Sequence, residues 1–226
     1  MIIRTARLVA AKDLRVERRS RVLLNQVVPF AVLVMVVFAF ALDDDAVLTR
    51  VAPGLVWLAT LFSLLVMVQR SFAVETADGA LDALRVAGVA PSAVFIGKSV
   101  ALIVELLVLE VLLFGAAVVL YRAEVAWSGV VLLLATSFLA TCGLAFVGTL
   151  YGGLAAGARG RETLLPLLVL PVVAPALIGA TRATEAALGI DGAAPGEGWP
   201  WVGLLAVYAA AFGAGGVMSF GALIDE

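Results

Sequence analysis

Two glutamates inside a long apolar run are the first residues of this sequence that could do chemistry. Glu105 and Glu110 fall in a membrane span predicted over residues 94–120. A carboxylate at membrane depth costs roughly several kcal/mol, so it is a candidate for proton or ion movement. A spacing of five residues is about 140° around a helix, so the two side chains do not share a face. The alternative is that each is protonated or hydrogen-bonded to Ser, Thr or backbone of a neighbouring span.

A second candidate feature is a run of three prolines in one predicted span. Pro166, Pro171 and Pro175 lie in "TLLPLLVLPVVAP", within a span predicted over residues 163–181. Proline frees backbone carbonyl groups and kinks a helix, which is tolerated where neighbours or a cavity satisfy those groups. The spacing favours a bent or broken helix that lines an interface or a pathway.

A polar stretch, "ETADGALDALRVAGVAPSAVFIGK" over residues 75–98, separates two apolar runs. Asp78 is a good helix N-cap, and Leu81 and Leu84 lie on one face of the helix that would follow. Such a helix, with more acids than bases, is too short to be stable alone and is repelled by anionic lipid. We therefore expect it to dock in a cleft of another protein.

The end of this helix is also marked in the sequence. Gly88 can adopt the left-handed conformation that closes a helix, and Pro91 prevents its continuation. The expected helix therefore covers residues 78–87.

Motifs for catalysis are missing from the sequence. It has no phosphate-binding loop, no nucleophile next to a base, and no histidine. The single Cys142 excludes an internal disulfide. We therefore expect a chain that is not itself an enzyme, with no metal site and no cofactor assigned to it.

The elements that must position these residues follow from composition. The chain has 226 residues, 63% of them hydrophobic and only 14% charged. A soluble domain carries about a quarter charged residues, so this pattern indicates an all-α integral membrane protein forming one domain over residues 1–226. Six spans are predicted, at about 22–42, 51–70, 94–120, 126–151, 163–181 and 199–224. Trp57, Trp127, Trp199 and Trp201 lie mostly near span ends, where interfacial positions are expected.

The distribution of basic residues predicts the orientation. Of the 15 Lys and Arg residues, all but Arg50, Arg122 and Arg182 fall on the side of both termini. Positive charge marks the cytoplasmic side, so both termini and the segment 75–92 are expected in the cytosol and the loop 182–198 outside. The basic residues 1–21 have Ile3, Ala6, Ala10 and Leu14 at helical spacing, which predicts an amphipathic helix on the membrane surface.

The polar stretch resembles the cytosolic loop of ABC-type export permeases. The matching residues are Glu75, Gly79, Leu81, Asp82, Leu84, Pro91 and Lys98. Within that superfamily the chain is similar to the cytochrome c maturation protein B (CcmB) family. This second resemblance rests on Ala-Pro-Gly at residues 52–54, on Trp57, Arg70 and Asp78-Gly79, and on the proline-rich fifth span.

The resemblance implies a type V-like permease subunit in a bacterial inner membrane. It implies that the ATPase-coupling residues are Glu75, Asp78, Gly79, Leu81, Asp82, Leu84 and Pro91. It further implies a homodimer, an ATP-binding CcmA-like subunit, and CcmC-like and CcmD-like membrane partners. Their task would be haem export or release of a haem-loaded chaperone, with haem as cargo and no nucleic acid involved.

Two other functions remain open at this point. The same permease architecture could export a drug, a lipid or a polysaccharide. A stand-alone proton-coupled carrier using Glu105 and Glu110 is a third reading, although it leaves the polar stretch 75–98 unexplained.

Overall fold

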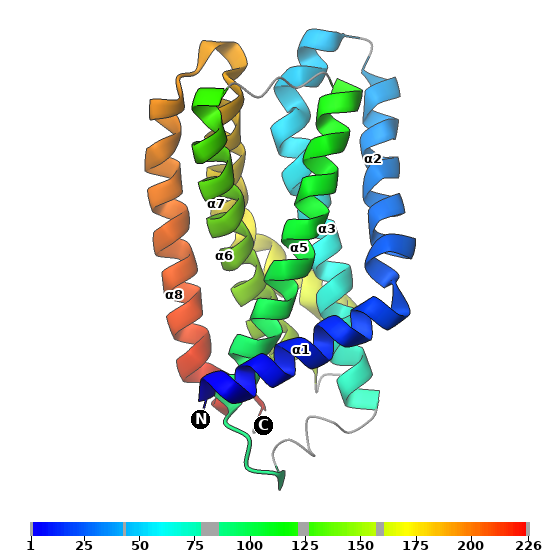
Figure 1. The fold of residues 1–226 in the computed structure, drawn as a ribbon, viewed down its shortest axis with the longest axis vertical. Helices are drawn as coiled ribbons and strands as arrows, with labels where there is room; N and C mark the ends of the chain where they lie inside the picture. Colours follow the sequence, from blue (N-terminus) through cyan, green and yellow to red (C-terminus); the bar gives the residue numbers. More distant parts are fainter. Residues whose placement is uncertain (1, 43, 78–85, 122–126, 157–160, 225–226) are drawn as a thin grey trace.

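The chain folds as a bundle of long helices, shown by a computed structural model (Figure 1). The structure describes residues 2–42, 44–77, 86–121, 127–156 and 161–224. The helices of this part are α1 (Ile2–Ser20), α2 (Val28–Ala41), α3 (Asp45–Ala77), α5 (Pro91–Tyr121), α6 (Val130–Ala156), α7 (Arg161–Leu188) and α8 (Trp199–Ile224). Short turns of π- or 3-10 helix add η1 (Leu23–Val27), η2 (Trp127–Gly129), η3 (Ile190–Gly192) and η4 (Pro195–Gly198).

The six expected spans are confirmed. Six helical segments of the described chain are long and apolar enough to cross a membrane, and the first of them combines η1 with α2. The largest difference concerns the second span, expected over residues 51–70, because α3 extends over Asp45–Ala77. Asp44 accepts hydrogen bonds from the amides of Ala46 (2.8 Å) and Val47 (3.4 Å), and so caps the first turn of α3.

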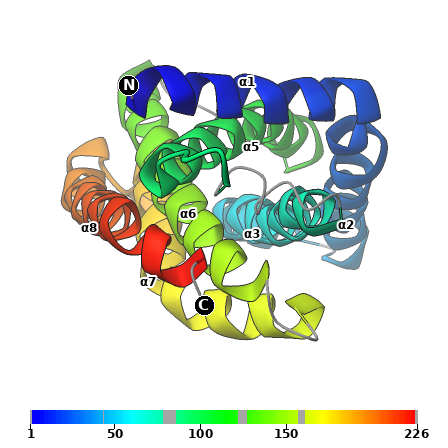
Figure 2. The same cartoon turned by 90° about the horizontal axis from the view of Figure 1, so that it is seen from below.

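The amphipathic helix expected over residues 1–21 is α1, which lies across the bundle rather than along it (Figures 1 and 2). Its buried residues, Ala6, Val9 and Ala10, face α5. Ile3 points away from the bundle and is 77% exposed. One face of α1 therefore packs on protein, while apolar residues outside that face are available to a bilayer surface.

The two ends of the chain lie at the same end of the bundle, beside α1 (Figure 1). At the opposite end, the loop expected over residues 182–198 is shorter than expected, because α7 continues to Leu188. The remaining residues form only η3 and η4, so no re-entrant helix pair is built there.

Trp57 is an exception to the interfacial positions expected for most of the tryptophans, because it lies in the core. Its side chain is only 1% exposed, and its indole N–H donates a 2.9 Å hydrogen bond to Thr184 Oγ1 on α7. Its ring meets Phe114 of α5 edge-on, with 6.5 Å between centroids. The indole N–H of a tryptophan needs a hydrogen-bond acceptor, which is water at an interface and can be a hydroxyl group in a core. Here the acceptor is the hydroxyl group of Thr184.

The three prolines do not break α7. The helix is continuous over Arg161–Leu188 with Pro166, Pro171 and Pro175 inside it, so of the two expected forms, bent or broken, it is not broken, and a bend at the prolines stays a prediction. Pro171 and Pro175 are exposed on the outer face of the bundle.

Candidate functional site

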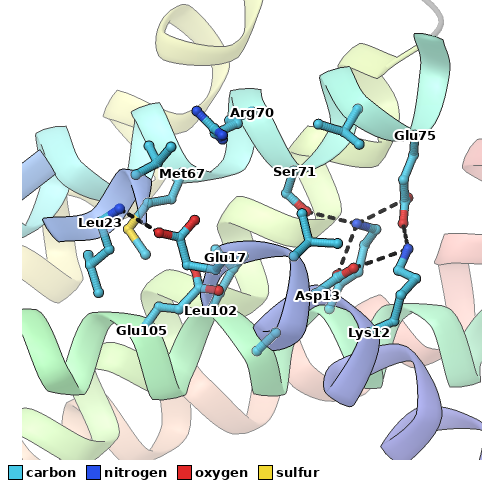
Figure 3. Close-up of a pocket in the computed structure, with 15 residues that line it drawn as sticks. Lys12, Asp13, Glu17, Leu23, Met67, Arg70, Ser71, Glu75, Leu102 and Glu105 are labelled. Atoms are coloured by element: carbon cyan, nitrogen blue, oxygen red, sulfur yellow. Dashed lines mark hydrogen bonds and ion pairs between the residues drawn. The ribbon is translucent and has the colours of Figure 1, made fainter. Parts of the chain in front are cut away.

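The most polar feature of the interior is an ion cluster under α1, formed by Lys12, Asp13, Ser71, Glu75 and Lys98 (Figure 3). The Lys98 ammonium lies 3.0 Å from Glu75 Oε2 and 3.3 Å from Asp13 Oδ2, and donates a 2.8 Å hydrogen bond to Ser71 Oγ. Lys98 is 1% exposed and Glu75 3% exposed. A buried charge is tolerated only when it is paired and hydrogen-bonded, which this arrangement provides.

The α1 side of the cluster is contributed by adjacent residues. Lys12 donates a hydrogen bond to Glu75 and lies 3.1 Å from Asp13. Burial lowers the pKa of Lys12, but the hydrogen bond to Glu75 and the charges of Asp13 and Glu75 outweigh it. The pKa of Lys12 therefore lies above its usual value of 10.5. The cluster thus joins three helices: α1, the end of α3 and the start of α5.

The close contact of α1 with α5 depends on Gly97, the residue before Lys98. A Cβ atom at this position would lie 2.6 Å from Val9 Cβ and 2.7 Å from the Ala6 carbonyl oxygen. Only glycine lets the two backbones approach so closely. The ring of Phe72 lies 4.6 Å from the Lys98 ammonium and covers it from the α3 side.

A cavity of about 210 Å³ adjoins the ion cluster, between α1, α3 and α5. Glu17 and Glu105 lie together at one end of it, and the ion cluster closes the other end (Figure 3). Its apolar wall comes from Val16, Val22, Leu23, Met67, Val74, Ala101 and Leu102. Arg70 also lines the cavity.

The structure refines the depth expected for Glu105. Its charged neighbours are Glu17, Asp13 and Lys98. Glu17 accepts a hydrogen bond from the amide of Leu23, the first residue of the first span. Glu105 therefore lies level with the point where that span begins, at the same height as the surface helix.

Glu110 has a different environment, as the 140° separation from Glu105 predicted. It is buried between α5 and α6, where the Thr141 hydroxyl donates a hydrogen bond to its carboxyl group. Ser137 of α6 is a second neighbour of that group. Glu110 thus has the hydrogen-bonded setting that was the alternative to proton transfer, and it lies outside the cavity.

The structure describes only part of the expected coupling segment. Glu75 belongs to the ion cluster, Gly88 has the left-handed φ of +69° expected for a helix end, and Pro91 opens α5. The other expected coupling residues lie outside the described residues: Asp78, Gly79, Leu81, Asp82 and Leu84.

Sequence reasoning missed the cluster itself. Lys12 and Asp13 lie 63 and 85 residues from their partners Glu75 and Lys98, and no local pattern reports such a distance. One signal was available: Lys12 and Lys98 are the only two lysines in the chain, and every other basic residue is arginine. Both lysines belong to this one cluster.

Together, the fold and the site define a multi-pass α-helical membrane protein with a surface helix locked to its second and third spans. The sequence matches the family model described as CcmB protein over residues 4–212. The chain therefore belongs to the CcmB family.

Curated relatives agree over most of their length. "Heme exporter protein B" of Rhodobacter capsulatus is 32% identical over 176 residues, covering 76% of this chain and 78% of the relative. The protein of the same name from Paracoccus denitrificans is 31% identical over 185 residues, covering 80% and 83%. That of Haemophilus influenzae is 32% identical over 178 residues, covering 78% and 79%.

Proposed function

We propose that this chain is the membrane subunit of an ATP-driven haem export complex, and that it works as a homodimer in the bacterial inner membrane with both termini in the cytosol. Family membership and the names of the curated relatives support the haem export component. A separate CcmA-like ATPase supplies ATP hydrolysis, and CcmC-like and CcmD-like partners handle the haem. The chain itself is not catalytic.

The observation that carries the coupling proposal is the Lys98–Glu75 ion pair. These residues lie on either side of the segment 76–90, which runs from the last two residues of α3 to the start of α5 and contains most of the expected ATPase-coupling residues. Because Lys12 binds Glu75 and Asp13 binds Lys98, α1 is fastened to both ends of that segment. A displacement imposed on the segment would thus move α1, α3 and α5 together.

This arrangement assigns a mechanical role to the buried charges. A buried ion pair is weak evidence for stability, because its desolvation offsets most of its attraction, but it does fix the register of the groups it joins. Here it would hold the two ends of the segment 76–90 in place relative to each other. A force from the ATPase would then tilt the spans and would not be absorbed by movement of the segment itself.

The primary test is co-purification of the chain with its ATPase subunit. We expect Leu81→Asp and Leu84→Asp to abolish co-purification without unfolding the spans, because the two leucines form the expected docking face. Val47→Asp, an exposed apolar residue at the opposite end of the bundle, is the matched control and should retain the ATPase. Full retention of the ATPase by both leucine variants would refute the docking proposal.

A second measurement separates coupling from docking. Glu75→Gln should leave the ATPase bound but lower ATP-dependent release of the haem-loaded chaperone by the assembled complex. Unchanged release, with the ATPase bound, would show that the ion cluster transmits no force. ATPase binding combined with release of another cargo, and none of haem, would refute the haem export function while keeping the permease architecture.

A further inference from the structure

The cavity under α1 has a charge pattern that the coupling role does not use. Of its charged lining residues, Lys12, Asp13, Glu75 and Lys98 neutralise one another within the ion cluster. The remaining ionisable groups are two carboxyl groups and one guanidinium: Glu17, Glu105 and Arg70. Within the described residues, no hydrogen bond or ion pair links Arg70 to either carboxylate.

This charge balance limits the ligand. An anion would meet two carboxyl groups at one end of the cavity, and among the described lining residues Arg70 is the only positive charge outside the ion cluster. Ca²⁺ and Mg²⁺ prefer six or more oxygen ligands, and the described residues provide no group of three His, Cys, Asp or Glu side chains placed to hold a metal ion. A group that carries an ammonium, with N–H donors for carboxylates, fits both observations.

The apolar wall of the cavity and its location in the bundle indicate that the ligand also has an apolar part. Val22, Leu23, Met67 and Leu102 are buried apolar residues next to the two carboxylates. Glu105 lies level with the start of the first span and beside a surface helix. The start of a membrane span is expected near the boundary between lipid headgroups and acyl chains.

We propose that the cavity between α1, α3 and α5 binds the headgroup of a phospholipid with a primary ammonium, phosphatidylethanolamine, from the leaflet on which α1 lies. Glu105 and Glu17 accept hydrogen bonds from the ammonium, and Arg70 binds the phosphate. The first methylenes of the tails lie against Met67 and Leu102. The lipid would fill the space under α1 next to the ion cluster, whatever the cargo of the complex.

The test is native mass spectrometry of the full chain released from nanodiscs of defined lipid composition. With equal amounts of phosphatidylethanolamine, phosphatidylcholine and phosphatidylglycerol, we expect retained phosphatidylethanolamine to dominate. Phosphatidylcholine has the same charge but no N–H donor, so it reports the hydrogen bonds specifically. Glu105→Gln should lower the retained phosphatidylethanolamine about tenfold, the loss expected for one charge-assisted hydrogen bond. Glu110→Gln, the same change on the same helix outside the cavity, should not.

Two further variants keep the proposal falsifiable. Glu105→Lys should shift the preference toward phosphatidylglycerol, a gain that a misfolded chain cannot show. Glu17→Gln should act like Glu105→Gln. Equal retention of the three lipids, equal loss in Glu105→Gln and Glu110→Gln, or displacement of the lipid by millimolar free ethanolamine would overturn the proposal. The last result would indicate a site for a soluble amine.

Discussion

The ammonium of Lys98 lies 3.0 Å from a carboxylate oxygen of Glu75, and these two buried residues enclose between them the segment 76–90. A pair in this position sets the spacing of α3 and α5 at the end of the bundle where α1 crosses them. The cluster is therefore a structural joint between three helices, and under the proposed coupling it is the point where a force on the segment would enter the spans.

Removing one member of this pair should destabilise the chain strongly. We expect Lys98→Met to lower the free energy of unfolding by about 3 kcal/mol or more, because Glu75 would keep a buried charge with only Lys12 beside it. Lys98→Met combined with Glu75→Met should be less destabilising than the sum of the single changes. Unfolding of the purified chain in a denaturing detergent measures these differences.

The matched control is the exposed ion pair of Arg50 with Asp191, at the other end of the bundle. Its atoms are 2.8 Å apart, closer than those of Lys98 and Glu75, but both side chains are about 60% exposed. Arg50→Met should cost less than about 1 kcal/mol. If Arg50→Met and Lys98→Met cost the same, burial is not what makes the cluster important.

The contact between α1 and α5 should be sensitive to a single methyl group. We expect Gly97→Ala to displace α1 and to cost roughly 1–3 kcal/mol, because the new Cβ would meet backbone and Cβ atoms of α1. Gly115→Ala on the same helix has no atom within 4 Å of the new Cβ and should be neutral or stabilising. Crosslinking of cysteines placed on α1 and α5 would detect the displacement. If Gly97→Ala crosslinked as efficiently as the unchanged chain, α1 would not have moved, and the packing described would be contradicted.

Trp57 should behave as a core residue. Trp57→Phe removes the indole donor to Thr184, and we expect a loss of about 1 kcal/mol in the free energy of unfolding. Trp127→Phe is the control, since Trp127 is 92% exposed and should change stability little. If Trp127→Phe lowered the free energy of unfolding more than Trp57→Phe does, Trp57 would not be acting as a core residue.

Glu110 distinguishes a structural carboxyl from a proton carrier. Glu110→Gln keeps an oxygen acceptor for Thr141, so we expect chaperone release by the complex to persist, whereas Glu110→Leu should lower stability by about 1 kcal/mol. A stand-alone proton-coupled carrier predicts instead that Glu105→Gln or Glu110→Gln abolishes pH-dependent transport in liposomes without ATPase. That result would exclude the coupling proposal.

Lys12 provides a pH-dependent reading of the cluster. Its folded-state pKa is raised, so its contribution to stability is fully present below 10.5 and is lost as the pH rises through the higher folded value. Amine-reactive labelling needs the neutral form, so the labelling of Lys12 should begin at a higher pH than in Glu75→Gln. Lys98, which is buried, should stay unlabelled in both until the chain opens. If Lys12 were labelled over the same pH range in both proteins, Glu75 would not be what raises the pKa of Lys12.

The membrane architecture could be predicted from the sequence because a span is a local property. A run of about twenty apolar residues must be a helix in a bilayer, and each of the six runs is one. The polar site could not be predicted in the same way. Glu105 and Glu110 look alike in sequence, yet one faces a cavity under α1 and the other faces Thr141, because their partners come from helices distant in the chain.

Two details of the helices also depend on features that no local pattern reports. Most of the tryptophans were expected near span ends, but Thr184, 127 residues away from Trp57, supplies the hydrogen-bond partner of its indole inside the bundle. A bent or broken helix was expected in α7 because proline removes backbone hydrogen bonds. The helix continues through Pro166, Pro171 and Pro175 nonetheless, since a membrane-spanning helix gains little by breaking where no water is available.

The crossing of α1 over α5 also has a consequence for biosynthesis. Asp13 leaves the ribosome 85 residues before Lys98, its partner. At a synthesis rate of 5–20 residues per second, α1 must wait about 4 to 17 s before its docking surface exists. Because α1 is amphipathic, it can bind flat on the bilayer surface during this interval, until Gly97 emerges and the third span inserts beneath it. The first helix of the chain therefore reaches its final position only after the third span has been inserted.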